Sequence, residues 1–389
     1  MRDDEAIPLI VWATLKGSYY EIKEKIRREE KKMGLFEMME EHGHEQMIFC
    51  YNQPTQLKAI IAIHDTTLGK AVGGCRVWKY SSEKEAIADA LILSEIMTYQ
   101  SAISDCDTGG GKIVLWHDLE EEPDEAYYRA LGRFIQGLKG RIVTYPDLGT
   151  DTQEMKYIRR ETEHVLLYET SLGLRAESSE LTAYGVYWGM KACVKELYGV
   201  SSLDGLTVGI QGVGSVGQIL ADYLKEEKVK LVVTDLNYDS IKRVQDRYPD
   251  TLIVKPAEIL TCKCDILSPC ALGPVFTKQN MDELNCKIIA GGAYNVLEDA
   301  SLAEELYKRG ILYAPDFVIN SGELFLTADA LKILSKEEAL ARVKKIYDIM
   351  AKVLTISKRE NISPYEAAYR LAKERIKKVG DIKNILCCI

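Results

Sequence analysis

The stretch LTVGIQGVGSVGQIL at residues 206–220 decides the fold of the second half of the chain. An apolar segment ends at Gln211, glycines follow at positions 212, 214 and 217, and a helical pattern then covers Gln218–Lys225. Glycines at this spacing permit a tight turn and let a pyrophosphate approach the helix N-terminus, where unpaired N–H groups and the helix dipole favour an anion. Asp235 ends the next predicted strand, eighteen residues after Gly217. This order of strand, glycines, helix and acidic residue predicts a Rossmann-type dinucleotide site.

Asp235 also distinguishes between dinucleotides. Its carboxylate would accept hydrogen bonds from the adenosine ribose and repel a 2′-phosphate, and the following Leu236 and Asn237 carry no positive charge. We therefore expect NAD rather than NADP. Strands that alternate with helical patterns around this site predict a doubly wound parallel sheet. The predicted strands of this half are Leu206–Gln211, Lys230–Asp235, Asp265–Leu267, Lys287–Ala290 and Ile311–Tyr313.

A second informative stretch is MTYQSAISDCDTGGGK at residues 97–112. Gly109, Gly110 and Gly111 carry no side chains, so a substrate or a nicotinamide ring could lie directly against the backbone. Lys112 follows and begins an apolar run that predicts a buried strand. A lysine in that position is a candidate general base, because burial favours its neutral form. The alternative is a glycine-rich turn without chemistry.

The first half of the chain predicts a separate α/β domain. Ser82 and Glu85 predict a capping box at the start of a helix that includes Ala86–Met97. The other predicted elements of this half are strands Lys58–Asp65, Lys112–Asp118 and Arg141–Thr144, a helix at Asp124–Leu138 and a loop at Tyr145–Gly149. A polar loop at Thr170–Glu180 is expected to lead into a long helix at Thr182–Leu197, and Lys336–Lys378 is expected to be helical.

Composition limits the class of protein. A chain of 389 residues exceeds what one hydrophobic core usually serves, so two domains are expected. The formal charge of −9 argues against a nucleic-acid partner or an anionic membrane surface. No apolar stretch reaches the length of a membrane span, and Ala6–Leu15 follows acidic residues, which argues against a signal peptide. The ten cysteines are scattered, so we expect reduced thiols, a cytoplasmic location and no metal site at Cys262, Cys264 and Cys270.

Seven motifs occur in one order along the chain: GGCRVW at 73–78, GGGK at 109–112, TYPDLGT at 144–150, TAYGVYWGMKA at 182–192, QGVGSVG at 211–217, CDILSPCALG at 264–273 and YAPDFVINSG at 313–322. Together they resemble the leucine/phenylalanine/valine branch of the NAD-dependent amino-acid dehydrogenases. The resemblance extends from about Met33 to about Lys377. It implies a substrate and oligomerisation domain at 33–180 completed by the C-terminal helix at about 345–389, a dinucleotide domain at 181–344, and a homo-oligomer. Residues 1–32 form an extension with a charged helical segment predicted at Tyr20–Lys32.

The resemblance implies two catalytic residues. Lys112 would act as the base on water, and Asp147, within TYPDLGT, would carry a proton near the substrate nitrogen. An ordinary Asx turn is the alternative for Asp147. Gly73 and Gly74 would form the floor of the substrate site. For the apolar residues that would line this site, core packing is the alternative. The residues that would line the side-chain pocket are Val72, Met97, Leu324 and Thr327.

The resemblance also implies a set of cofactor contacts. The nicotinamide and its ribose would be lined by Thr182, Cys270, Ala271 and Asn295. The rest of the dinucleotide would contact Gly212, Val213, Gly214, Ser215, Val216, Gly217, Asp235 and Leu236.

Several positions near the acid end of the substrate depart from this resemblance. Gln100 stands where the family usually carries a lysine that binds the substrate carboxylate, and Tyr294 stands where it usually carries an asparagine. Glu323 replaces a small residue and Glu180 replaces a proline. A glutamine offers only neutral hydrogen bonds, whereas a lysine–carboxylate contact is charge-assisted, and a nearby glutamate disfavours an anion further. Either the pocket takes a related amine, or it holds an amino-acid carboxylate through other donors.

We therefore expect an NAD-dependent oxidoreductase that acts on a CH–NH₂ group. It would reversibly convert an L-amino acid similar to leucine, valine or phenylalanine, or a related amine, to a carbonyl compound and ammonia. Two alternatives remain open. One is an amine or imine oxidoreductase that needs no substrate carboxylate, and the other is a weakly active NAD-binding regulatory protein on the same fold.

Overall fold

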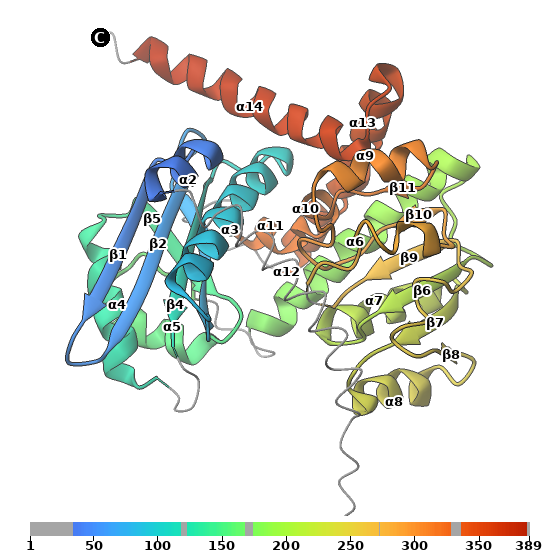
Figure 1. The fold of residues 1–389 in the computed structure, drawn as a ribbon, viewed down its shortest axis with the longest axis horizontal. Helices are drawn as coiled ribbons and strands as arrows, with labels where there is room; N and C mark the ends of the chain where they lie inside the picture. Colours follow the sequence, from blue (N-terminus) through green and yellow to red (C-terminus); the bar gives the residue numbers. More distant parts are fainter. Residues whose placement is uncertain (1–33, 118–122, 168–173, 272, 328–335, 387–389) are drawn as a thin grey trace, which may run out of the picture.

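The computed structural model describes residues 34–117, 123–167, 174–271, 273–327 and 336–386. Within these ranges the strands form one sheet of five and one sheet of six. Figure 1 shows the two sheets as separate bodies with helices between and above them. This confirms the predicted fold class, an N-terminal α/β domain followed by a Rossmann-type parallel sheet. The helical segment predicted at Tyr20–Lys32 lies outside the described residues.

The first sheet has the strand order β1-β2-β4-β3-β5. β2 pairs antiparallel with both β1 and β4, whereas β3 pairs parallel with both β4 and β5. One face is covered by α2 and α3, and the other by α4 and α5, through two separate apolar clusters. The bounds are α2 Leu35–His42, β1 Gln46–Asn52, β2 Leu57–Asp65, β3 Ala71–Trp78, α3 Glu83–Ile103, β4 Gly109–Trp116, α4 Glu125–Gly137, β5 Ile142–Pro146 and α5 Thr152–Arg159.

The start of α3 follows the sequence prediction in part. Ser82 is the N-cap, and its hydroxyl accepts a hydrogen bond from the Glu85 N–H at 3.2 Å. The Glu85 carboxylate instead accepts from the N–H of Ser81 at 2.9 Å. The predicted capping box therefore forms with its reciprocal half moved one residue toward the N-terminus.

The second sheet is parallel throughout, with the strand order β11-β10-β9-β6-β7-β8. The order in which the chain adds strands reverses between β6 and β9, and the glycine-rich turn follows β6. The bounds are β6 Thr207–Gln211, α7 Ser215–Glu226, β7 Lys230–Thr234, α8 Tyr238–Arg247, β8 Leu252–Ile253, β9 Ile266–Pro269, η1 Met281–Glu283, β10 Ile288–Ile289, α9 Ser301–Lys308 and β11 Leu312–Tyr313.

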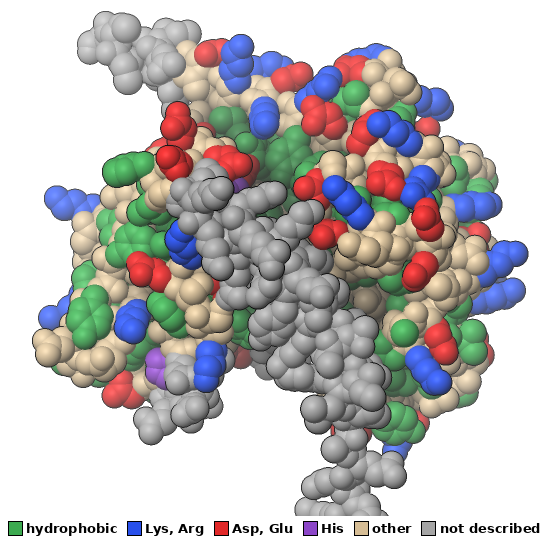
Figure 2. Space-filling view, viewed as in Figure 1, with side chains coloured by type: hydrophobic (Ala, Val, Ile, Leu, Met, Phe, Trp, Pro, Cys, Tyr) green, Lys and Arg blue, Asp and Glu red, His purple; other side chains and the backbone are tan. Residues whose placement is uncertain are grey.

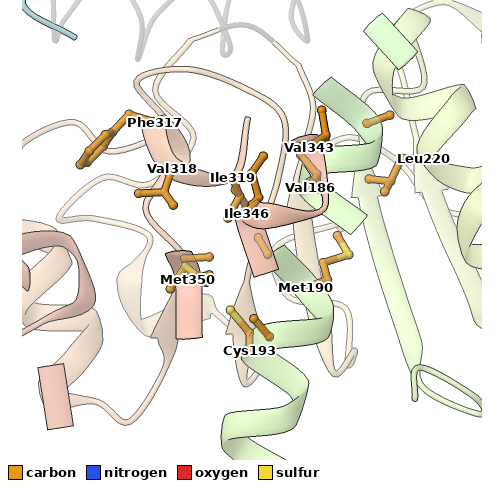
Figure 3. Packing of buried hydrophobic residues seen from close by; sticks show 14 of the residues in the cluster. Val186, Met190, Cys193, Leu220, Phe317, Val318, Ile319, Val343, Ile346 and Met350 are labelled. Carbon is orange, nitrogen blue, oxygen red and sulfur yellow. The ribbon is translucent and has the colours of Figure 1, made fainter. Parts of the chain in front are cut away.

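The remaining helices connect the two sheets. Buried apolar residues of the long helix α6 pack against α7, α10 and α13. Figure 3 shows Val186 and Met190 of α6 together with Ile346 of α13. α14 returns to the first domain, where Arg375 donates to the Cys106 carbonyl and to Asp107, each at 2.7 Å. The bounds are α6 Leu174–Tyr198, α10 Asp316–Ile319, η2 Ser321–Glu323, α11 Leu324–Thr327, α12 Lys336–Val343, α13 Lys345–Glu360 and α14 Pro364–Leu386.

Two element starts differ from the prediction. α6 begins at Leu174, so the described part of the predicted loop at Thr170–Glu180 is helical. Glu180 explains the extension, because it keeps the backbone N–H and the conformational freedom that a proline there would remove. β4 begins at Gly109 rather than at Lys112. The three glycines are therefore strand residues, paired with β2 and β3.

The surface carries charges of both signs. Figure 2 shows Lys and Arg side chains interspersed with Asp and Glu on the face in view. Among the described residues, none of the helices combines the length and the apolarity needed to cross a bilayer.

Candidate active site

Lys112, Arg76 and Asp147 come together because β3 lies between β4 and β5. Lys112 Nζ donates to Asp147 Oδ2 at 2.5 Å, and Arg76 Nε donates to the same oxygen at 3.1 Å. Arg76 also forms an ion pair with Asp89 of α3, at 3.1 Å. Lys112 is only 5% exposed, whereas the Asp147 side chain is 24% exposed. The structure thus brings both predicted catalytic residues into direct contact.

The charge state of Asp147 follows from this arrangement. Burial would raise the pKa of Asp147, but the Lys112 ammonium and the Arg76 guanidinium outweigh burial and hold that pKa well below its usual range. The carboxylate is therefore ionised at any ordinary assay pH while both cations are in place. Its stabilising effect is present above the ordinary aspartate pKa and is lost only as the pH falls through the depressed value.

Gly74 leaves room for the Lys112–Asp147 pair. A Cβ at this position would lie 2.7 Å from Asp147 Cβ and 3.4 Å from Lys112 Nζ. Gly73 has a different surrounding, because its Cβ would lie 1.8 Å from the Gly111 carbonyl oxygen. Close packing of β3 on β4 alone explains a glycine at position 73, so its contact with substrate stays a prediction.

The turn after β5 holds Asp147 in place. The Asp147 N–H donates to Thr150 Oγ1 at 3.0 Å, and that hydroxyl donates to the Cys75 carbonyl at 2.7 Å. Gly149 has a φ of +81°, and a Cβ there would lie 2.5 Å from the Val77 carbonyl oxygen. Within TYPDLGT, the threonine and the glycine therefore anchor the turn to β3 and aim the aspartate at Lys112.

A chain of hydrogen bonds links α3 to the η2 turn; we name it the Gln100–Glu323 chain. Gln100 Nε2 donates to Asn320 Oδ1 at 2.8 Å, and Gln100 also forms a hydrogen bond with the Tyr294 hydroxyl. Tyr294 donates to Glu323 Oε1 at 2.9 Å, and Ser178 of α6 donates to Glu323 Oε2 at 2.6 Å. Three of the four positions that the sequence analysis singled out, Gln100, Tyr294 and Glu323, are thus linked by hydrogen bonds.

Electrostatics connect this chain to the ion pair. Burial raises the pKa of Glu323 above its usual value, although the hydrogen bonds from Ser178 and Tyr294 oppose the shift, and the charges of Asp147 and Lys112 both act on Glu323. Burial and the Glu323 carboxylate raise the pKa of Tyr294 well above its usual value. Tyr294 therefore keeps its proton, and its hydroxyl donates a hydrogen bond to Glu323.

The predicted lining residues are mostly buried. Met97 is 6% exposed and its sulfur accepts a hydrogen bond from the Tyr145 hydroxyl at 3.7 Å. Leu324 is 1% exposed, and Val72 is fully buried within an apolar cluster, which favours core packing for Val72. The side chain of Thr327 lies outside the described residues.

The glycine-rich turn between β6 and α7 fits a dinucleotide. Gly212 has a φ of +90°, and a Cβ at Gly217 would lie 2.1 Å from the Gly212 carbonyl oxygen, so both positions need glycine. A Cβ at Gly214, the N-cap of α7, would meet nothing within 4 Å. Open space in front of a helix N-terminus without a side-chain cap matches the predicted pyrophosphate site.

Asp235 closes the same site. Its Oδ2 accepts from the Val213 N–H at 2.7 Å and its Oδ1 accepts from the Asn237 N–H at 2.8 Å. These bonds tie the end of β7 to the glycine-rich turn and place the carboxylate at its rim. Leu236 beside it is 51% exposed.

The other predicted cofactor residues lie along the junction between the turn, α6 and η2. A Cβ at Gly292 would lie 2.8 Å from Val216 Cγ1 and 3.8 Å from Cys270 Sγ, which places those residues around one point. Ala271 packs against Gly212, where a Cβ would lie 2.8 Å from Ala271 Cβ. Gly322 lies against Thr182, and Ser215 begins α7. Asn295 is exposed, with a φ of +52°.

Sequence reasoning missed three residues of this region. Arg76 lies within the quoted motif GGCRVW, and its charge beside two glycines was the available signal. Asn320 lies within the quoted motif YAPDFVINSG, but its contact with Gln100 spans 220 residues, and Ser178 had no local signal, because its partner lies 145 residues away. Among the described residues, no group of three His, Cys, Asp or Glu side chains is placed to hold a metal.

Comparisons with known proteins agree with this geometry. Residues 44–164 match the family described as Glu/Leu/Phe/Val dehydrogenase, dimerisation domain, and residues 235–381 match Glutamate/Leucine/Phenylalanine/Valine dehydrogenase. A leucine dehydrogenase of Bacillus cereus is 46% identical over 90% of this chain and 94% of its own length. A phenylalanine dehydrogenase of Thermoactinomyces intermedius is 40% identical over 90% of this chain and 96% of its own.

A solved structure gives the same result. The L-tryptophan dehydrogenase from Nostoc punctiforme superposes with a TM-score of 0.76 at 37% identity, covering 89% of this chain and 99% of its own. These matches span nearly the whole chain and include both sheets. The chain belongs to the Glu/Leu/Phe/Val dehydrogenase family.

Proposed function

We propose that this dehydrogenase uses NAD to oxidise the CH–NH₂ group of an L-amino acid or a closely related amine, reversibly, to a carbonyl compound and ammonia. The observation that carries the proposal is the Lys112–Asp147 pair, held at 2.5 Å against Gly74, where the pair leaves no room for a side chain. The relatives named for leucine, phenylalanine and tryptophan support an apolar amino-acid side chain in the substrate.

Each group of the pair has a separate task. Bound nicotinamide would accept a hydride from the substrate carbon, which leaves an imine that water must attack. Lys112 takes the proton from that water as general base. The Asp147 carboxylate stabilises the positive charge that Lys112 then carries, and Arg76 holds the carboxylate toward it at 3.1 Å.

The pair also accounts for a second proton transfer. While Lys112 is charged, its ammonium keeps the pKa of Asp147 too low for the carboxylate to accept a proton. When Lys112 has given up its proton, the effect of the ammonium on Asp147 is removed and only Arg76 still lowers the pKa of this carboxylate. Asp147 can then hold a proton for the substrate nitrogen, which agrees with the second role expected from the sequence.

The preference for NAD rests on Asp235. Its carboxylate is anchored by the N–H groups of Val213 and Asn237, so it cannot turn away from a 2′-phosphate without breaking both bonds. The nearest following side chain, Leu236, is apolar and offers a phosphate no charge. Repulsion between the carboxylate and a phosphate therefore disfavours NADP.

The proposal includes a homo-oligomer and a cytoplasmic location. The first is supported by the match of residues 44–164 to a dimerisation domain. The second is supported by cysteine chemistry, since all eight cysteines among the described residues are free thiols.

A direct assay tests the proposed function. Purified protein is incubated with NAD and each of a panel of L-amino acids, amino-acid amides and plain amines, and NADH formation is followed. We expect at least one amine of the panel to reduce NAD, and Lys112→Met to abolish that reduction while NADH still binds. NADH binding without turnover of any amine would contradict the proposal and favour a regulatory role.

A further inference from the structure

The donors and acceptors of the Gln100–Glu323 chain all run in one direction. The Gln100 amide donates to Asn320 and to Tyr294, Tyr294 donates to Glu323, and Ser178 donates to the other Glu323 oxygen. Both amide hydrogens of Gln100 are thereby used, and so is the hydroxyl hydrogen of Tyr294. What this chain still offers a ligand is acceptor capacity on Glu323 and on the Gln100 carbonyl, and one donor, Asn320 Nδ2, which has no hydrogen-bond partner within the described residues.

One of these acceptors has no donor. Gln100 is fully buried, and within the described residues its Oε1 has no hydrogen-bond partner. A buried acceptor without a donor is unfavourable, so a ligand N–H that reaches it gains a bond and displaces none. The adjacent Asn320 Nδ2 is a buried donor without a partner among the described residues, so an amide group, which carries both an N–H and a carbonyl, complements the two, whereas a carboxylate leaves Gln100 Oε1 unpartnered.

The local charges point the same way. In the linked group around Lys112, the described cations are Lys112 and Arg76, and both already bind Asp147. The carboxylates are Asp147, Asp89 and Glu323, one more than the cations. An anionic ligand would therefore add to an excess of negative charge, whereas a neutral or cationic donor would not.

We propose that the Gln100–Glu323 chain selects substrates with an N–H donor on the carbon next to the one that bears the reacting amine. This donor takes the place that the carboxylate has in an amino acid. The substrate class is that of amino amides and vicinal diamines. Gln100 and Glu323 accept the donor, and Tyr294 holds the Glu323 carboxylate at 2.9 Å. This inference rests on the proposed function and narrows its substrate class.

The reaction with an amino amide balances as for any oxidative deamination. The C–H bond breaks with transfer of its electron pair to NAD, and water adds to the resulting imine carbon. The C–N bond then breaks, so that the protonated amino amide, NAD⁺ and water yield the keto amide, NADH, ammonium and one proton. The amide group takes no part in the chemistry and serves only as the donor that is recognised.

Three matched pairs of compounds test the inference: L-leucine, L-valine and L-phenylalanine, each against its own amide. Members of a pair share side chain and stereochemistry, so the ratio of their kcat/KM values isolates the group at the acid end. We expect each amide to exceed its acid at least tenfold. Glu323→Gln should lower this ratio at least tenfold, because it removes the charge that attracts a donor and repels a carboxylate.

Two further variants keep the test falsifiable. Tyr294→Phe removes the hydroxyl that orients Glu323 and should lower the same ratio, even where Glu323→Gln fails to fold. Glu226→Gln changes an exposed glutamate at the end of α7 and should leave the ratio unchanged. Binding of each acid and amide to the NADH complex gives a second readout that is independent of turnover.

The outcomes separate this inference from the proposed function. Acids that are turned over and bound better than their amides, with a ratio that Glu323→Gln leaves unchanged, overturn the inference while the proposed function stands. Failure of these six compounds and of every other amine of the panel to reduce NAD, in a protein that binds NADH, overturns both.

Discussion

Replacing Lys112 with methionine is the most informative change to the proposed catalytic pair. Methionine keeps much of the apolar volume in a site that is only 5% exposed and removes the amine. Loss of a general base lowers kcat by roughly 10²–10⁴-fold in enzymes of this kind. Asp147 keeps Arg76 at 3.1 Å, so the carboxylate is not stripped of cations.

The same geometry sets the expected effect on stability. Removing one partner of a buried ion pair costs about 3–5 kcal/mol when the other charge is left unpaired. Because Arg76 remains, we expect the free energy of unfolding to fall by less, about 1–3 kcal/mol. Steady-state NADH formation and urea unfolding measure the two effects separately, and Lys70→Met, an exposed lysine, is the control.

A double variant examines the coupling of the pair. Lys112→Met and Asp147→Asn combined should lower kcat/KM by much less than the product of the two single effects, because residues that act as a unit are not additive. Activity of Lys112→Met within a few-fold of the unchanged protein, with NADH still bound, would refute the assignment of Lys112 as base.

Three other predictions concern the cofactor site and the first domain. The protein should prefer NAD to NADP at least tenfold in kcat/KM, and Asp235→Ser should narrow this preference; equal use of both dinucleotides would contradict the role of Asp235. Gly217→Ala places a Cβ 2.1 Å from the Gly212 carbonyl oxygen and should weaken NADH binding at least tenfold in titrations, whereas Gly137→Ala, with nothing within 4 Å, should not. Burial lowers the pKa of His44 to about 3, so as the pH falls the unfolded chain binds a proton at His44 before the folded chain does. The free energy of unfolding should therefore fall as the pH drops below about 6.5, by about 2 kcal/mol at pH 5. Urea unfolding at pH 7 and pH 5 should show this loss, and a His44→Asn variant with the same pH dependence would disprove it.

Local signals explain why much of the fold was predictable. The glycines at 212, 214 and 217 carry information about their own backbone, since φ at Gly212 and the close approach at Gly217 both exclude a side chain. The apolar runs of β2, β4, β6 and β7 are long enough to predict strands from composition alone. β8 escaped prediction because it has two residues, and both are exposed.

The candidate site was less accessible to sequence reasoning. The family resemblance assigned Lys112 and Asp147 to one site, because each lies within a quoted motif, GGGK and TYPDLGT. The contact of Gln100 with Asn320 spans 220 residues and depends on how η2 docks on α3. No local pattern encodes such a contact, so the sequence indicated a change at Gln100 without its partner.

The central claim is that the Lys112–Asp147 pair catalyses the release of ammonia from an amine, coupled to the reduction of NAD to NADH. Simultaneous measurement of ammonium and NADH, with the best amine of the panel as substrate, tests it most directly. The account predicts one ammonium for each NADH, and loss of both products together in Lys112→Met. NADH formed without ammonium would show that the enzyme oxidises a different bond, and would contradict the account.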